Sequence, residues 1–145
     1  MHDFPHLYTV TAAGGVDGDV VLEGAALPPL RSDSPAEFGG PGDRWSPETL
    51  LVAAVADCFI LSFRAIAKAT KLPWDAIECA VSGTLDRVEK VTQFTGFQVR
   101  ATLRVPAGTD EAKARAAMER AEHICLITNS LKAKAHLDAT VEISG

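Results

Sequence analysis

The stretch of sequence that decides the fold is Ser46-Pro47-Glu48-Thr49-Leu50-Leu51-Val52-Ala53-Ala54-Val55-Ala56-Asp57-Cys58-Phe59. Ser is a good N-cap residue, Pro suits the first helical position, and Glu favours the positive end of a helix. The apolar pattern continues beyond this stretch and stops before Pro73. We therefore predict a long helix from Ser46 to about Thr70.

The polar residues of this helix fall on one narrow stripe when they are placed at about 100° per residue. They are Asp57, Arg64, Lys68 and Lys71. A helix that is apolar over the rest of its circumference is typical of a buried helix with one wet edge. Cys58 lies about 100° from the stripe, so we expect its thiol inside the protein or at the floor of a pocket.

The segments on either side of the helix read mainly as strands. Before it, a hairpin turn at residues 14–18 joins two short strands, and a loop follows. After it come two long strands, a second helix, a short helical turn and a last strand. The expected bounds are Leu7–Val10, Val20–Leu22, a loop at Leu27–Asp43, Ile77–Leu85, Phe97–Val105, a helix from Thr109 to about Ile124, a turn at Asn129–Ala135 and Ala139–Ile143. The order predicts a single α+β domain over residues 1–145, with antiparallel sheet packed on a long central helix.

Composition excludes several classes of function. The chain has 145 residues, 47% of them hydrophobic and 6% aromatic, with a net charge of −5. A negative balance opposes binding to nucleic acid or to an anionic membrane. The most apolar stretch, Leu50–Phe63, is short for a membrane span and contains Asp57, and the start of the chain does not resemble a secretory signal. We therefore expect a cytoplasmic protein with no membrane or nucleic-acid partner.

The cysteines are the residues with the most chemistry. Cys58, Cys79 and Cys125 are widely spaced and form no CxxC pair, so we expect free thiols rather than a disulfide framework. Cys58 and Cys125 both occupy inward helical positions, where a cysteine is either a small buried hydrophobe or a reactive thiol. Cys79 alternates with apolar residues on a strand and reads as packing. His123 and Cys125 point to different faces of a helix, so we predict no metal site.

Two segments resemble one known family. The stretch from Ser46 to Phe59 is similar to the "NPEQLLAAAxAACF" helix of the OsmC/Ohr family, and Ala121-Glu-His-Ile-Cys125-Leu-Ile-Thr-Asn-Ser-Leu131 is similar to its "AxxxCPVSNAL" segment. The two motifs occur in the right order, 67 residues apart between the cysteines. The resemblance covers nearly the whole chain and implies the OsmC-like fold in an intertwined homodimer.

The resemblance also implies an enzyme, a thiol-dependent peroxidase that reduces organic hydroperoxides. Cys58 would be the attacking thiol and Cys125 the resolving thiol, with Glu48 as a further site residue. Family membership implies two active sites at the dimer interface. We expect no bound cofactor, an organic hydroperoxide as substrate and an external dithiol as reductant.

The sequence departs from this family at three positions. The Ohr hairpin "GGRDG" supplies an Arg that assists the cysteine, and this chain has Val16 there. Leu126 and Thr128 replace the Pro and Ser of the second motif. Arg44 and Arg31 are the candidate replacement cations. Without a cation, the pKa of Cys58 should be near or above the ordinary ~8.5 of a thiol.

Glu48 and Cys58 are ten residues apart, so about 15 Å of helix separates them and a joint role needs a partner's helix. Glu48 has a second interpretation, as a first-turn acid that complements the helix dipole. The missing Arg also leaves a different class of function open. In that alternative the protein is a non-catalytic pocket that binds an apolar ligand or senses oxidation.

Overall fold

The computed structural model describes residues 1–144 and has the α+β architecture that the sequence predicts. The chain divides into two compact units, Met1–Leu50 and Leu51–Gly145, with the division falling in the first turns of the long helix. Each unit contains one three-stranded sheet. That the whole chain behaves as a single domain stays a prediction.

The first unit is built on a small antiparallel sheet with strand order β1-β2-β3. The predicted hairpin is confirmed, because residues 14–19 connect β1 to β2. The first strand begins after the predicted Leu7–Val10, and β3 was expected to be loop. The elements are β1 (Thr11–Ala13), β2 (Val20–Glu23), β3 (Leu30–Ser32) and the short 3₁₀ helix η1 (Ala36–Phe38).

The long helix α1 spans Pro47–Thr70, as predicted. Its start is fixed by a reciprocal cap. The N–H of Thr49 donates to Ser46 Oγ at 3.1 Å, and the N–H of Ser46 donates to Thr49 Oγ1 at 2.9 Å. Its end is a Schellman-type turn, in which Lys71 adopts φ 54° and the N–H of Leu72 donates to the carbonyl of Ala67 at 2.9 Å.

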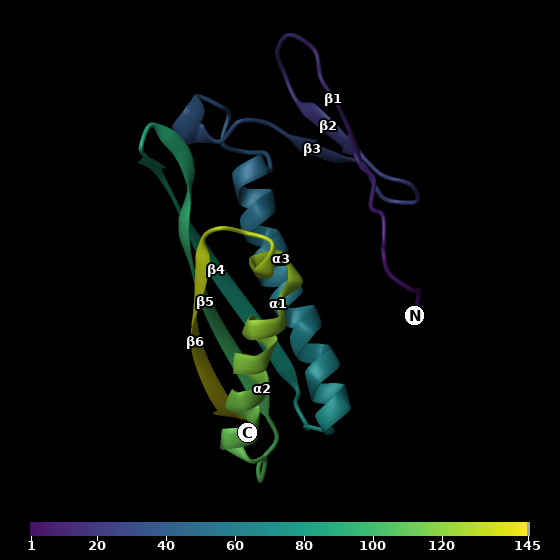
Figure 1. Cartoon of the computed structure of the whole chain (residues 1–145), viewed down its shortest axis with the longest axis vertical. Helices are drawn as coiled ribbons and strands as arrows, with labels where there is room; N and C mark the ends of the chain where they lie inside the picture. Colours follow the sequence, from purple (N-terminus) through teal and green to yellow (C-terminus); the bar gives the residue numbers. More distant parts are fainter. Residues whose placement is uncertain (145) are drawn as a thin grey trace. The chain divides into compact units, whose positions relative to one another are not determined.

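The second sheet has strand order β4-β5-β6 and belongs to the larger unit (Figure 1). Its strands are β4 (Ala76–Val88), β5 (Val91–Val105) and β6 (Lys134–Ile143). The β4–β5 hairpin is antiparallel, as predicted, but β6 pairs with β5 in parallel, so the sheet is mixed. The parallel pairing requires a crossover, which the segment containing the second helix provides.

The connection between β5 and β6 contains two helices, α2 (Glu111–Ile124) and α3 (Leu126–Asn129). Asp110, not the predicted Thr109, caps α2, because its carboxylate accepts from the N–H groups of Ala112 and Lys113. The predicted helical turn at residues 129–135 is wrong, because the short helix α3 ends at Asn129 and β6 already begins at Lys134, earlier than the predicted Ala139. Cys125 is the single residue between the two helices, and its ψ of 109° turns the chain from one into the other.

The core lies between the helices and one face of the second sheet. The inward residues of β5 alternate with polar ones and are almost fully buried: Phe97, Val99, Ala101, Leu103 and Val105. The buried face of α1 contributes Val55, Phe59, Phe63, Ile66 and Ala67, and α2 contributes Ala114, Ala117, Met118 and Ala121. Both helices therefore cover the same face, and the opposite face carries the polar residues.

Gly83 lets α1 approach the second sheet closely. A Cβ built at this position would lie 2.9 Å from a ring carbon of Phe94 and 3.0 Å from Phe97 and from Val52 of α1. Real Cβ atoms essentially never come closer than this, so any side chain would push the neighbours apart.

α1 is also long and apolar enough, by length and composition, to cross a membrane. The most apolar stretch of the sequence, residues 50–63, is shorter than this helix, which extends to Thr70. The core helix of a soluble protein passes the same test. This observation is therefore weak support for a membrane span.

Candidate functional site

The structure brings the Cys58 and Cys125 thiols together, as the family resemblance implies. Cys58 lies in the middle of α1 and is half-buried, and Cys125 is fully buried at the junction of α2 and α3. The two thiols lie near enough for each to shift the pKa of the other. Two residues 67 positions apart thus form one site inside the larger unit.

Several neutral donors surround the sulfur of Cys58. Burial by itself raises the pKa of this thiol, but hydrogen bonds from the N–H of Ile127, the Cys125 thiol, the Ser62 hydroxyl and the N–H of Leu126 together lower it below the ordinary value. The Ser62 hydroxyl is one helical turn away, with its Oγ 3.9 Å from Cys58 Sγ. Hydrogen bonds to a charged group favour that charged form, so the site favours a thiolate at Cys58.

The sequence alone predicts a Cys58 pKa near or above the ordinary value of a thiol, whereas the neighbours of Cys58 in the structure shift its pKa downward. Within residues 1–144, every group that lowers the pKa of Cys58 is a neutral hydrogen-bond donor. Two of them are amides at the start of α3, where N–H groups have no acceptor within their own helix. Backbone dipoles fill the role that we had assigned to a guanidinium.

Cys125 is perturbed in the opposite direction. Burial raises the pKa of its thiol, and the hydroxyl and N–H of Thr128 offset this only in part. The hydrogen bond to Cys58 raises it further, because Cys125 is then the donor and must keep its proton. The pair is therefore asymmetric, with a thiolate favoured at Cys58 and a thiol at Cys125.

Cys79 behaves as the packing residue that the sequence predicts. It lies on β4 opposite Ala101 and packs against the core. Burial, with a smaller contribution from Cys125, raises the pKa of Cys79 to about 11. It is a thiol at neutral pH and a natural internal control for the other two.

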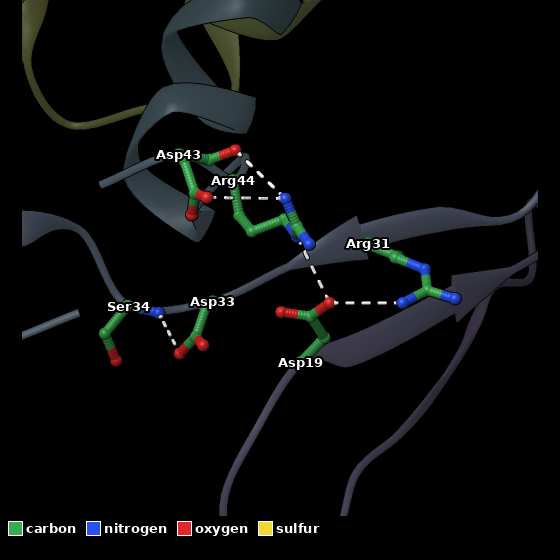
Figure 2. A network of polar contacts seen from close by, with 6 residues as sticks. All are labelled: Asp19, Arg31, Asp33, Ser34, Asp43 and Arg44. Carbon is green, nitrogen blue, oxygen red and sulfur yellow. Dashed lines mark hydrogen bonds and ion pairs between the residues drawn. The ribbon is translucent and has the colours of Figure 1, made fainter. Parts of the chain in front are cut away.

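The two candidate cations both contact Asp19 in the first unit (Figure 2). Arg44 Nε lies 3.1 Å from Asp19 Oδ2, and Arg31 Nη1 lies 3.5 Å from the same oxygen. The hydrogen bond and charge of Asp19 raise the pKa of Arg44 above its ordinary value. Neither Arg is among the groups that act on the pKa of Cys58 in this structure, so their assignment as its cations has no support here.

Glu48 and Val16 also belong to the first unit. Glu48 is in the first turn of α1, three turns before Cys58, so the two do not meet along the helix. Its Oε1 is buried and finds no hydrogen-bond donor in the part of the chain that the structure describes. Val16 is exposed in the β1–β2 connection.

A small apolar cavity of about 150 Å³ lies in the larger unit, lined by Leu51, Gln93, Phe94, Phe97, Leu131, Lys132 and Ala133. Leu51 precedes Cys58 by two helical turns, on the same side of α1. A larger hollow of about 540 Å³ lies between the end of α1 and the start of α2. No group of three His, Cys, Asp or Glu side chains that could hold a metal ion occurs among residues 1–144.

Reasoning from the sequence missed three donors at the site. Ser62 could have been found, because a residue four positions after Cys58 shares its helix face. The N–H groups of Leu126 and Ile127 gave no signal in composition or periodicity. One weak signal existed at position 126. This chain has Leu there in place of the Pro of the family motif, and Leu, unlike Pro, has a backbone N–H.

Fold and site together define an α+β protein with a paired-thiol site at the junction of its helices. The family model of OsmC-like proteins matches residues 40–140. The chain is also 30% identical, over 95% of its own length and 95% of the relative's, to an organic hydroperoxide resistance protein of Xanthomonas axonopodis pv. citri. The protein belongs to the OsmC/Ohr family.

Solved structures show the same fold. An OsmC-like protein of unknown function from Vibrio cholerae matches with a TM-score of 0.80 and 18% identity, over 97% of this chain and 100% of that one. An organic hydroperoxide resistance protein from Legionella pneumophila matches with a TM-score of 0.72 and 24% identity, over 99% and 100% of the two chains. The predicted OsmC-like fold is thereby confirmed.

Proposed function

We propose that this protein reduces organic hydroperoxides with Cys58 as the nucleophile and Cys125 as the resolving thiol. The observation that carries the proposal is that the fold brings two free thiols from distant parts of the sequence into one site, where the pKa of Cys58 is lowered and that of Cys125 is raised. The names of relatives described as organic hydroperoxide resistance proteins support the class of substrate.

In the first step the Cys58 thiolate attacks one oxygen of the O–O bond. An S–O bond forms, the O–O bond breaks, and the leaving alkoxide takes up a proton to become the alcohol. Cys58 is oxidised to a sulfenic acid and the peroxide is reduced. The neutral donors around Sγ favour this step because they maintain the thiolate at lower pH.

In the second step the Cys125 sulfur attacks the sulfenic sulfur of Cys58, and water leaves as the disulfide forms. Cys125 loses its proton in this step, so its raised pKa keeps it protonated until Cys58 has reacted. An external dithiol then reduces the disulfide by exchange and is itself oxidised.

The surroundings of the site favour an apolar peroxide. The 150 Å³ cavity at Leu51, Phe94 and Phe97 lies about two turns of α1 from Cys58 and is not lined by either cysteine, but its mainly hydrocarbon lining suits an alkyl chain. Hydrogen peroxide would gain nothing from such a lining. An organic hydroperoxide should therefore be the better substrate.

The proposal includes a homodimer and a cytoplasmic location. α1 is apolar on nearly all sides, yet its burial is incomplete and Leu61 stays 53% exposed. An apolar surface of this kind favours association with a second copy. The unpartnered Oε1 of Glu48 also requires a donor, which a second chain can supply. Relatives in the family are soluble proteins, which favours this arrangement over a membrane span for α1.

Peroxide consumption by single cysteine variants tests the chemistry. Cys58→Ser should abolish consumption of an alkyl hydroperoxide in the presence of a dithiol. Cys125→Ser should permit one turnover and leave a sulfenic acid on Cys58 that a dimedone probe labels. Cys79→Ser is the matched control and should retain activity. Equal losses from Cys58→Ser and Cys79→Ser would contradict the assignment, and so would a wild-type protein that consumes no peroxide.

Sedimentation velocity tests the assembly. A dimer should be the main species at micromolar concentration. Leu61→Glu should shift the equilibrium towards monomer, because it places a charge at an exposed apolar position of α1. Ser82→Glu, which adds the same charge at an exposed position on β4, is the control. A monomeric wild type at this concentration would refute the dimer.

A further inference from the structure

The hollow between the end of α1 and the start of α2 takes no part in the proposed chemistry. Its volume is about 540 Å³, and both helices belong to the larger unit (Figure 1). Neither Cys58 nor Cys125 lines it, and its lining residue nearest to Cys58 on α1 is Ile66, about 12 Å further along the helix. Small-molecule sites in proteins typically enclose about 300 to 1,000 Å³. The hollow is therefore large enough for a ligand of its own.

Part of the lining is apolar and buried. Ile66 of α1 and Ala117 of α2 are each 6% exposed, and Leu72, in the turn after α1, is half-buried. Thr70 and Thr109 add hydroxyls, but each of these donates to a backbone carbonyl at 2.8 Å. A hydrocarbon group in the hollow would therefore leave water and gain apolar contact.

Three cations line the same hollow, namely Lys71, Lys113 and Arg120. None of the three forms an ion pair with another side chain among residues 1–144. Asp110 is the acidic residue of the lining, and its carboxylate caps α2 by accepting from the N–H groups of Ala112 and Lys113 at 3.0 and 3.3 Å. The hollow thus has three cations against one acid, in a chain whose net charge is −5.

Two of these cations occupy positions that are locally unfavourable. Lys71 has φ 54°, a left-handed conformation that favours glycine at the end of a helix. Lys113 lies in the first turn of α2, where the positive end of the helix dipole disfavours a cation. Departures from local preference of this kind are expected mainly at functional sites. The fold therefore keeps positive charge at this hollow at some cost to its own stability.

The spacing of residues on α2 leaves room between the cations. Lys113, Ala116, Ala117 and Arg120 lie on one side of the helix, because residues three, four and seven positions apart share a face. Lys113 and Arg120 are about 10 Å apart along the helix axis, with the two alanines between them. The small alanine side chains leave space for a ligand that reaches either cation.

We propose that this hollow binds an organic carboxylate that carries a hydrocarbon chain. The unpaired cations attract the carboxylate, and the buried apolar side chains contact the hydrocarbon chain. Charge complementarity selects an anion, and the apolar lining distinguishes a chain-bearing anion from a small inorganic one. A ligand held here contacts both α1, which carries Cys58, and α2, which ends at Cys125, so its binding stabilises the packing of the two helices.

Isothermal titration calorimetry on the reduced full-length protein tests the site, with octanoate as the probe. Octanoate should bind with a dissociation constant below about 1 mM, as expected for a ligand of about ten non-hydrogen atoms. Acetate has the charge without the chain, and 1,2-octanediol has the chain without the charge. Each should bind at least about tenfold more weakly than octanoate. No saturable binding of octanoate up to about 10 mM would overturn the proposal.

Variants of the lining place the ligand. Removing both α2 cations with Lys113→Gln and Arg120→Gln should weaken octanoate binding at least about tenfold. The matched control, Lys90→Gln with Arg100→Gln, removes the same charge at exposed positions outside the hollow and should stay within about twofold of wild type. Ala116→Phe should also weaken binding, because its ring occupies the hollow.

Equal weakening in the two double variants would overturn the proposal, because binding would then follow the total charge of the protein. Loss of binding in Cys58→Ser would overturn it as well, because the ligand would then sit at the thiols. If circular dichroism shows that the α2 double variant has unfolded, Ala116→Phe, at an exposed position, carries the same test. Binding is measured without peroxide, so the result is independent of the proposed peroxidase activity.

Discussion

The two units of the chain stabilise charge in different ways. In Met1–Leu50, Asp19 is neutralised by the charges of Arg31 and Arg44. In Leu51–Gly145, the Cys58 thiolate is favoured by amide, hydroxyl and thiol donors that carry no charge. Exposed ion pairs are screened by salt and contribute little to stability, whereas backbone donors at a half-buried sulfur are screened much less.

The charged groups of the first unit form surface ion pairs, whereas the dipolar groups of the second unit act on a thiol. The Arg31–Asp19–Arg44 cluster uses long flexible side chains on an exposed surface (Figure 2). The donors at Cys58 are fixed by the backbone of α3 and by a hydroxyl on the same helix as the thiol. A preorganised group of dipoles loses little entropy when the thiolate forms. Reactivity should therefore depend on the helix junction more than on the arginines.

The largest expected effect is the contrast between Cys58 and Cys79. At pH 8 a thiol with a pKa of about 11 is ionised to roughly one part in a thousand, while Cys58 is below its ordinary value. Cys58 should be alkylated at least about a hundredfold faster than Cys79. Competition between light and heavy iodoacetamide, read by peptide mass spectrometry, measures the ratio. Similar rates at the two residues would show that the donors do not activate Cys58.

An intermediate effect is expected from Ser62→Ala. The variant removes a donor at 3.9 Å from Cys58 Sγ, a longer and weaker contact than an ordinary hydrogen bond. Alkylation of Cys58 at pH 7 should slow by about threefold, because the thiolate fraction falls. Ser82→Ala, at an exposed position on β4, serves as the control. An unchanged pH profile in Ser62→Ala would remove the hydroxyl from the set of donors.

The smallest effect is expected from Asp19→Asn and Arg44→Ala. Each breaks an ion pair near the surface, so the melting temperature should fall only slightly, and 1 M NaCl should reduce the difference. Alkylation of Cys58 at pH 7 should stay within about twofold of wild type. A tenfold loss of reactivity in Arg44→Ala would restore this residue as the cation of the site. Thermal unfolding and alkylation in the same samples provide both measurements.

The parts of the fold that the sequence predicted have strong local signals. The start of α1 follows from the Ser46 cap and from Pro47, and its end from the approach of Pro73. The β4–β5 hairpin follows from alternation on both sides of a short turn. Strand β3 has three residues beside a Pro, which is too little pattern to identify a strand. The parallel direction of β6 was missed because alternation does not depend on the direction of the neighbouring strand.

The site was only partly predictable, for a related reason. The inward positions of Cys58 and Cys125 follow from helical periodicity, and their pairing follows from the family resemblance. The donors to Cys58 are mostly backbone groups of a four-residue helix, and backbone groups leave no signature in side-chain composition. Arg31 and Arg44 attracted attention because they carry charge, yet Asp19 was the partner that the fold provided.

The position of the Cys58 thiol also depends on Gly83, which carries no reactive group. A side chain at position 83 would displace Val52. Val52 lies on α1, six residues before Cys58. A methyl group at position 83 would push the Val52 end of α1 away from the sheet and tilt the helix. The tilt would move the thiol of Cys58 away from α3 although none of the groups at the site had been substituted. Substitutions at Gly83 should thus be selected against for the alignment of the reacting sulfur as well as for packing.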